Sequence, residues 1–288
     1  MASTQQLKRR ITSVGNTKQI TKAMELVAAS KMKRAQDSAA RSRDYRNLAN
    51  AILTRLRELT DVDQHTLFKQ RTIESRLIIA VTSDRGLAGA YNSNVLRKLA
   101  RELGKNKDEK VSSQLIVVGR QAANFAGKLE GVEIIAAYQD FPEHATPNDI
   151  RPILNTITEL FGAKNIDAAD IIYTDFKSSI NQEVTLHRLL PAAFTEVHIP
   201  ADLENAVFEP SVQAVLDSVT LKLIEANLSQ ALLESQASEH SMRMMAMKSA
   251  TDNANELIDD LTLAFNTARQ AAITQEIAEI TGGAEAIK

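Results

Sequence analysis

The sequence predicts an α/β protein in which long N- and C-terminal helices form an antiparallel, left-handed coiled coil with an inserted Rossmann-like α/β domain. Two long stretches, 16–60 and 211–281, contain neither Gly nor Pro, which favours unbroken helices. Between them, short β-branched runs alternate with helical patterns, which is typical of a parallel sheet covered by helices. We therefore expect an N-terminal coiled-coil helix at 1–60, an α/β domain at 61–208 and a C-terminal coiled-coil helix at 209–288.

The N-terminal stretch has apolar residues at helical spacing, in seams that a phase shift near Gly15 separates. The first seam holds Leu7, Ile11 and Val14. After the shift the apolar positions are Ala28, Met32, Ala35 and Ala39, and later Ala49, Ile52, Leu56 and Leu59.

The middle of the chain predicts five strands. Four apolar, β-branched runs lie at 76–83, 114–119, 132–137 and 170–176, and a run at 183–191, closed by Pro191, has the character of an edge strand. Helical patterns lie at 92–103, 120–129 and 147–161. This alternation predicts a mainly parallel sheet with helices on its faces.

The C-terminal stretch carries a heptad seam typical of a coiled coil. Its predicted positions are Met247, Ala250, Ala254, Leu257, Leu261, Ala264, Ala268 and Ala271. The same register meets Gln236, His240 and Arg243 upstream, so we expect the seam to break there. Residues 1–58 are net basic and residues 211–288 net acidic, which favours pairing of the two helices with each other.

The segment LTLAFNTARQAAIT, at 261–274, is too apolar for a single covered stripe. Beyond the predicted seam it leaves Leu263, Phe265, Ala272 and Ile273, while Arg269 is its one charged residue. One partner helix covers about one stripe, so we expect this end of the helix to be enclosed by other proteins.

The rest of the sequence gives little support to catalysis. The formal net charge is -2 and there are no cysteines, which removes thiolate metal sites, disulfides and thiol chemistry. No signal peptide or membrane-spanning run is evident, and the chain is expected to be intracellular. The histidines at 65, 144, 187, 198 and 240 are scattered, so no metal site, cofactor or catalytic residue is predicted.

Two motifs leave alternatives open. The loop TSDRGLAGAYNSN, at 82–94, follows the first strand, and Gly86 and Gly89 give either a tight turn or the phosphate loop of a nucleotide-binding α/β enzyme with a helical arm. The basic run at 31–46 is either a solvated face or a surface for an acidic protein partner. A coiled-coil adaptor for nucleic acid is a third possibility, but no groove-reading module accompanies the run.

Three segments carry a resemblance to a known family. Residues 11–36, 82–94 and 242–286 resemble the signature segments of the gamma subunit of F-type ATP synthases, and the match runs along the whole chain in the right order. The resemblance implies a central-stalk rotor inside a ring of alpha and beta subunits, with the epsilon subunit and the membrane c-ring at its foot. Proton flow would turn the rotor, and the beta subunits, not this chain, would make or hydrolyse ATP.

The resemblance also implies particular contacts with the beta subunit. Met24 and Arg243 match one contact region, and Arg269 with Gln270 matches a pair that engages a beta-subunit loop, with Thr274 and Glu276 in the same network. The implied location is the cytoplasmic face of a bacterial plasma membrane, or alternatively the matrix face in mitochondria, with membrane association only through the complex. Residues 195–210 carry little family signature, so the contacts to epsilon and the c-ring stay unassigned.

Overall fold

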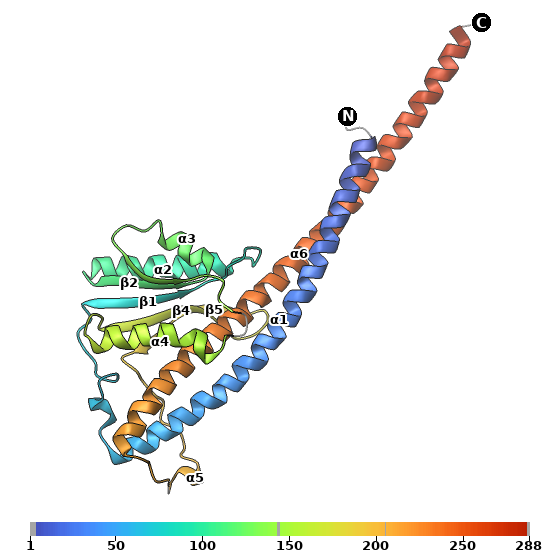
Figure 1. Ribbon diagram of the computed structural model, residues 1–288. Helices are drawn as coiled ribbons and strands as arrows, with labels where there is room; N and C mark the ends of the chain where they lie inside the picture. Colours follow the sequence, from blue (N-terminus) through green and yellow to red (C-terminus); the bar gives the residue numbers. More distant parts are fainter. Residues whose placement is uncertain (1–3, 143–144, 205, 287–288) are drawn as a thin grey trace. The chain divides into compact units, whose positions relative to one another are not determined.

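The computed structural model describes residues 4–142, 145–204 and 206–286. Along the sequence, a long helix, α1, precedes a five-stranded domain and a longer one, α6, follows it (Figure 1). The elements are α1 (Thr4–Leu59), η1 (Val62–Gln64), β1 (Ser75–Val81), α2 (Tyr91–Asp108), β2 (Ser112–Val118), α3 (Arg120–Ala126), β3 (Glu133–Tyr138), α4 (Pro147–Gly162), β4 (Ala168–Phe176), β5 (Gln182–Leu190), α5 (Ala201–Glu204) and α6 (Val212–Ala286). Every predicted strand and helix is therefore confirmed, with small shifts at the ends.

The sheet has the strand order β3-β2-β1-β4-β5. Neighbours among β1 to β4 pair in parallel, and β5 pairs antiparallel with β4 at one edge. This confirms the Rossmann-like arrangement and the edge position of the run at 183–191. The antiparallel edge follows from the short turn between β4 and β5, which leaves no room for a crossover helix.

Helices cover both faces of the sheet (Figure 1). On one face, Ile78, Leu115 and Ile172 pack with the apolar residues of α2 and α3, such as Val95 and Ala122. On the other face a larger core joins the strands to α4, to the end of α1 and to the first part of α6. Its fully buried members include Ile79, Ile116, Ile153, Leu53 and Leu228.

The chain divides into two compact units, and each long helix contributes to both. One unit runs from Ala29 to Met242 and contains the sheet with the adjoining parts of α1 and α6. The other contains the remaining described parts of the two helices, up to Ala28 and from Arg243 onward. The domain limits predicted at 60 and 208 follow the ends of α1 and the start of α6 rather than these compact units.

In the helical unit the seam of α6 differs from the predicted seam at every second position. Thr251 is buried, and Ile258 and Phe265 are half-buried, whereas Leu257 is 46% exposed and Ala264 is exposed. The prediction of Leu257, Ala264 and Ala271 as seam residues, and of Phe265 outside the seam, was therefore wrong, whereas Ala250 is half-buried beside the buried Thr251. The least exposed positions alternate by four and three residues, as a left-handed coiled coil requires: Met247, Thr251, Ala254, Ile258, Leu261, Phe265 and Ala268.

The predicted phase shift near Gly15 in α1 was also wrong. The seam continues past Val14 through Lys18, Thr21 and Glu25, which are buried or half-buried, to the buried Ala28. The hydroxyls of Thr21 and Thr251 lie 2.8 Å apart across the two helices. Polar residues therefore occupy seam positions that the spacing of apolar residues does not predict. Farther along α1, Leu53 is buried while Leu59 is 48% exposed, so Leu59 is not a seam residue.

The predicted break of the α6 seam upstream of Arg243 has a structural explanation. No residue from Leu223 to Ser241 is exposed, because the sheet domain packs on this part of α6 as well as α1. His240 and its neighbours therefore lie in a helix that is surrounded, and a single apolar stripe is not expected there.

Candidate partner-binding site

Within the described residues, the end of α6 extends past the start of α1. Thr21 lies opposite Thr251, and in an antiparallel pair a step back along α1 matches a step forward along α6. Leu7 lies as many residues before Thr21 as Phe265 lies after Thr251, so the two share a level, and α1 begins at Thr4, near the level of Ala268. Figure 1 shows the red end of α6 continuing past the start of α1.

Beyond that level the helix is exposed all round. Every residue from Ala271 to Gly282 is exposed, including Ile273 at 48%, Ile277 at 59% and Ile280 at 72%. Leu263 is 70% exposed on the side away from α1. Exposed apolar residues in this number are typical of a surface that another protein covers.

Four of the predicted contact residues lie on this exposed end. Arg269, Gln270, Thr274 and Glu276 are all exposed, and the Thr274 hydroxyl donates to the Gln270 carbonyl at 2.9 Å. The residues at 269, 273, 276 and 280 follow the spacing of one helical face, which therefore presents Arg, Ile, Glu and Ile side by side. No ion-pair partner for Arg269 occurs in the described part of the chain, so its guanidinium is available to a partner carboxylate.

The other two predicted contact residues form a separate group. Met24 on α1 is half-buried, and the seam register places it at the level of Lys248, close to the half-buried Arg243. Arg243 and Arg269 are separated by about 39 Å along α6, at about 1.5 Å per residue. The six residues therefore form two contact regions and not one.

The sequence reasoning missed part of the surface around Met24. Ile20 and Val27 are 60% and 55% exposed, and with Met24 they follow the i, i+4, i+7 spacing of one face of α1. This apolar face lies outside the seam. The signal was present in the spacing, but the seam was assumed to be the only apolar stripe.

The glycine loop between β1 and α2 is filled by its own side chains. One oxygen of Asp84 accepts the backbone N–H groups of Arg120 at 2.9 Å and Asp140 at 3.0 Å, and the Asn92 side chain accepts the N–H of Ser83 at 3.0 Å. Gly89 has a positive φ of 56°. The Asp84 carboxylate thus binds amides at the start of α3 and after β3, and the Ser83 amide of the loop itself is already occupied by Asn92, which favours a tight turn over a nucleotide site.

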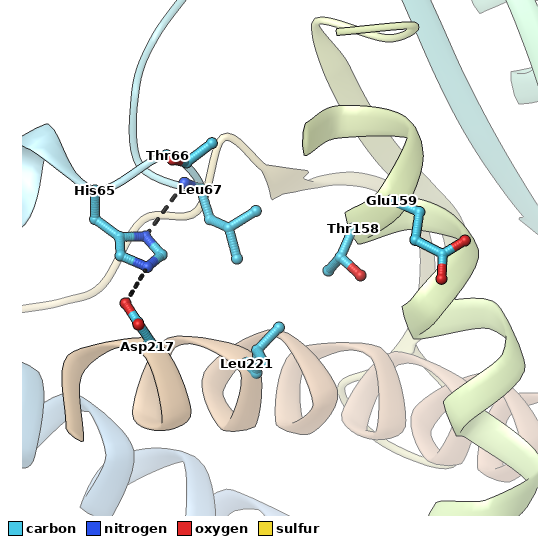
Figure 2. A pocket seen from close by; sticks show the side chains of 7 residues that line it. All are labelled: His65, Thr66, Leu67, Thr158, Glu159, Asp217 and Leu221. Atoms are coloured by element: carbon cyan, nitrogen blue, oxygen red, sulfur yellow. Dashed lines mark hydrogen bonds and ion pairs between the residues drawn. The ribbon is translucent and has the colours of Figure 1, made fainter. Parts of the chain in front are cut away.

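One open pocket lies elsewhere, between the segment after α1, α4 and the start of α6 (Figure 2). His65 accepts the Leu67 N–H at Nδ1, at 3.2 Å, and its Nε2 lies 3.1 Å from Asp217. Glu159 also lines the pocket, which has no Lys or Arg among its lining residues. This acidic lining is unsuited to phosphate groups, and the histidine contacts serve to attach the segment to α6.

Within residues 4–142, 145–204 and 206–286, no group of three or more His, Cys, Asp or Glu side chains is arranged to hold a metal ion; His144 lies outside these ranges. None of the described helices combines the length and the apolar character needed to cross a membrane.

The fold and the exposed end of α6 define a class of protein: an antiparallel coiled coil with an inserted α/β domain, whose longer helix carries an exposed apolar end. A family model described as ATP synthase matches residues 3–287. The chain is 38% identical to the ATP synthase gamma chain of Heliobacterium modesticaldum over 294 residues, and 38% identical to that of Geobacter metallireducens over 288 residues. Both alignments cover all of this chain and all of the relative.

Solved structures show the same fold. A chain of the Tetrahymena thermophila mitochondrial ATP synthase central stalk and c-ring matches with a TM-score of 0.61 at 25% identity, covering 80% of this chain and 99% of that one. A chain of the Euglena gracilis mitochondrial ATP synthase matches with a TM-score of 0.67 at 18% identity, covering 99% and 94%. The chain belongs to the family of ATP synthase gamma chains.

Proposed function

We propose that this chain is the non-catalytic rotor shaft of an F-type ATP synthase, turned by proton flow and acting on catalytic beta subunits. The observation that carries the proposal is the end of α6, where an exposed apolar helix extends past the described part of α1. The proposal is supported by the similarity to gamma chains, which is 38% identity over the full length of this chain. A turning helix with different side chains on each face contacts successive partners differently, and such differential contact is what shifts them between discrete states.

The proposed partners are the alpha and beta subunits, around the N-terminal part of α1 and the C-terminal part of α6, and the epsilon subunit and c-ring, beside the α/β domain. The membrane association is indirect, through the complex. By analogy with the bacterial relatives, the location is the cytoplasmic face of the plasma membrane; the matrix face of a mitochondrial membrane is the alternative.

We assign beta-subunit contacts to Met24, Arg243, Arg269, Gln270, Thr274 and Glu276. The physical support is strongest for Arg269, since an exposed guanidinium with no ion-pair partner among the described residues offers five donors to a carboxylate on a facing loop. Met24 lies within the exposed apolar face of Ile20 and Val27, which suits contact with an apolar part of the same partner.

The test uses the complex purified from membranes with Arg269→Ala or Met24→Lys in this chain. ATP-driven proton pumping at a matched hydrolysis rate is expected to fall by about tenfold for Arg269→Ala, the equivalent of one lost charge-assisted hydrogen bond. Met24→Lys is expected to lower pumping as well, because it places a charge in an apolar contact. Both variants should fold normally, since neither side chain is fully buried.

Arg101→Ala is the matched control, because Arg101 is an exposed arginine on α2, in the other compact unit of the chain. It is expected to pump like the unmodified complex. Normal pumping by both test variants would contradict the contact assignments. A chain that does not purify with alpha and beta subunits would contradict the proposed function itself.

A further inference from the structure

Polar side chains are concentrated in the part of α6 that is buried on all sides. Between Leu223 and Ser241, where no residue is exposed, the buried polar residues are Gln230, Glu234, Ser235, Ser238, His240 and Ser241. Serine has a lower helix propensity than alanine, and a buried hydroxyl needs a partner. Alanine would pack at these positions as well as serine does. The hydrogen-bond partners of the serine hydroxyls therefore indicate what serine contributes there.

Three serines, Ser235, Ser238 and Ser241, recur every three residues and face the α/β domain. The Ser235 hydroxyl lies 2.7 Å from the Tyr91 hydroxyl at the start of α2. The Ser238 hydroxyl donates to the Thr174 carbonyl of β4 at 3.0 Å. All three serines and Thr174 are completely buried.

Ser241 completes the series at the turn between β4 and β5. Its hydroxyl donates to the Ser179 carbonyl at 2.9 Å and accepts from the Gln182 side chain at 3.1 Å. The three serines therefore bind α2, β4 and the β4–β5 turn in succession along α6. We call Ser235, Ser238 and Ser241 the serine ladder.

On its other side, the same segment of α6 is bound to α1. Arg43 of α1 donates to the buried carboxylate of Glu234 at 3.0 Å, and the Gln230 side chain also donates to that carboxylate. The serine ladder and the Arg43–Glu234 ion pair thus hold α6 from two directions. A helix bound in this way cannot turn about its axis without losing directional bonds.

The spacing of the serine ladder is suited to resisting rotation. One hydrogen bond fixes a point, whereas three bonds spread over about 9 Å of helix fix both the axial position and the rotational angle, since each residue turns the helix by about 100°. The division between the two compact units falls directly after the ladder, between Met242 and Arg243. Beyond that point the seam residues of α6 are Met, Ala, Ile, Leu and Phe, apart from Thr251, whose hydroxyl lies 2.8 Å from that of Thr21.

We propose that Ser235, Ser238 and Ser241 are positioning residues that fix the rotational angle of α6 against the α/β domain, so that torque on this domain is carried into α6. This inference rests on the proposed rotor function. It predicts that removing the hydroxyls loosens the connection between the α/β domain and the helix without altering the surface that contacts the beta subunits.

The experiment uses the assembled complex with Ser238→Ala/Ser241→Ala. A probe on the α/β domain reports angular fluctuation while the catalytic ring holds the upper part of α6 stationary, and the variance is expected to rise. Proton pumping per ATP hydrolysed should fall, while the hydrolysis rate at low load stays unchanged. Hydrogen exchange of amides at 230–245 should accelerate by about fivefold for each hydroxyl lost.

Ser218→Ala is the control, because Ser218 is an exposed serine of the same helix.

A covalent bridge between α6 and β5 shows whether an increased angular fluctuation comes from lost torsional coupling or from a general loss of structure. The chain has no native cysteine, so Gln182→Cys/Ser241→Cys can be joined by a short bifunctional thiol reagent. Before bridging this variant should fluctuate more than the unmodified rotor, and after bridging the fluctuation should return to the original value.

Assembled complexes that show unmodified fluctuation and pumping in the double variant would overturn the inference, even if hydrogen exchange is faster. If the double variant does not assemble, the single variant Ser241→Ala, at the end of the serine ladder, is measured instead. Unmodified fluctuation and pumping in its assembled complexes would overturn the inference. Failure of the rotor function would appear differently, as a chain that does not join alpha and beta subunits at all. In that case the exchange measurement on the isolated chain would still report on the contacts.

Discussion

At the scale of single residues, the α/β domain depends on buried charges that are paired on several sides. Asp170 of β4 is completely buried between Arg76 and Arg188. Arg76 also donates to Asn106 of α2 at 3.0 Å, and lies 3.6 Å from Glu102. Such a network ties α2 to the first and fourth strands, and removal of one member leaves another charge without its partner.

Glu102 makes this network sensitive to acid. Burial raises the pKa of its carboxyl, but the hydrogen bonds and charges of Lys105 and Lys98, each 3.2 Å away, outweigh burial and lower it. A carboxyl with a lowered pKa in the folded state stabilises the fold above its unfolded pKa, and this stabilisation is lost as the pH falls through the folded value. The loss is therefore expected below about pH 4.5, the ordinary value for Glu.

Glu102→Gln tests this expectation. The variant should be less stable than the unmodified chain at pH 7, by about 1 kcal/mol, and the difference should shrink as the pH is lowered through 4. Urea unfolding midpoints across this range provide the measurement. Glu109→Gln, at an exposed position after α2, is the control and should show no such convergence. A constant difference at all pH values would contradict the assigned role.

Two glycines give opposite predictions when changed to alanine. Gly119, at the start of α3, has a φ of 93°, and an added Cβ would lie 2.2 Å from the Thr82 carbonyl oxygen. Gly119→Ala should therefore destabilise the domain by about 1–3 kcal/mol. Gly104 lies exposed within α2 with open space at its Cβ position, and Gly104→Ala should stabilise by about 0.5–1 kcal/mol. Unfolding midpoints of both variants check the signs; equal effects would contradict the argument.

At the scale of elements, the sequence predicted the strands and helices well because their signals are local. β-branched runs, the prolines and the glycines mark the sheet domain, and all five strands lie where the pattern placed them. The seam of the coiled coil was harder to predict. Ala250 and Thr251 are adjacent, and an apolar pattern selects the alanine, but the structure buries the threonine against Thr21. A small polar residue with a partner across the helices fits the seam as well as alanine does.

The exposure of the predicted contact residues could not be predicted from local sequence patterns either. Position along α6 was evident from the family resemblance, but the exposure of Arg269 and the extent of the uncovered end depend on where α1 begins relative to α6. This offset is a tertiary property that no local pattern contains. The serine ladder was missed for a related reason, since Ser238 and Ser241 donate to carbonyls of β4 and of the turn after it, 64 and 62 residues away, and Ser235 pairs with a hydroxyl of α2.

The corrected seam can be tested with adjacent residues. Ile258 is half-buried on the seam, while Leu257 is 46% exposed. Ile258→Ala should destabilise the helical unit by about 1–3 kcal/mol, and Leu257→Ala should change it by less than about 0.5 kcal/mol. Hydrogen exchange of α6 amides near these positions measures the local effect without requiring global unfolding. A larger effect at Leu257 would restore the seam first predicted from the sequence.

At the scale of the whole molecule, the uncovered end of α6 determines how the chain behaves outside a complex. Ile273, Ile277 and Ile280 are exposed on a helix that no other described part of the chain covers. Burial of each isoleucine is worth about 1.5–3 kcal/mol. The isolated chain should therefore associate reversibly through this end as its concentration rises, whereas in the complex other subunits would cover it.

The triple variant Ile273→Gln/Ile277→Gln/Ile280→Gln should weaken this self-association by at least about tenfold for each side chain that the contact buries, because 1.4 kcal/mol corresponds to a factor of ten. Sedimentation velocity over a range of concentrations gives the association constant. Ile180→Gln is the control, since Ile180 is 83% exposed in the β4–β5 turn, which belongs to the other compact unit. A chain that stays monomeric at all concentrations, with amides at 271–282 protected from exchange, would mean that it shields its own α6 end, and the reason for invoking an enclosing partner would be lost.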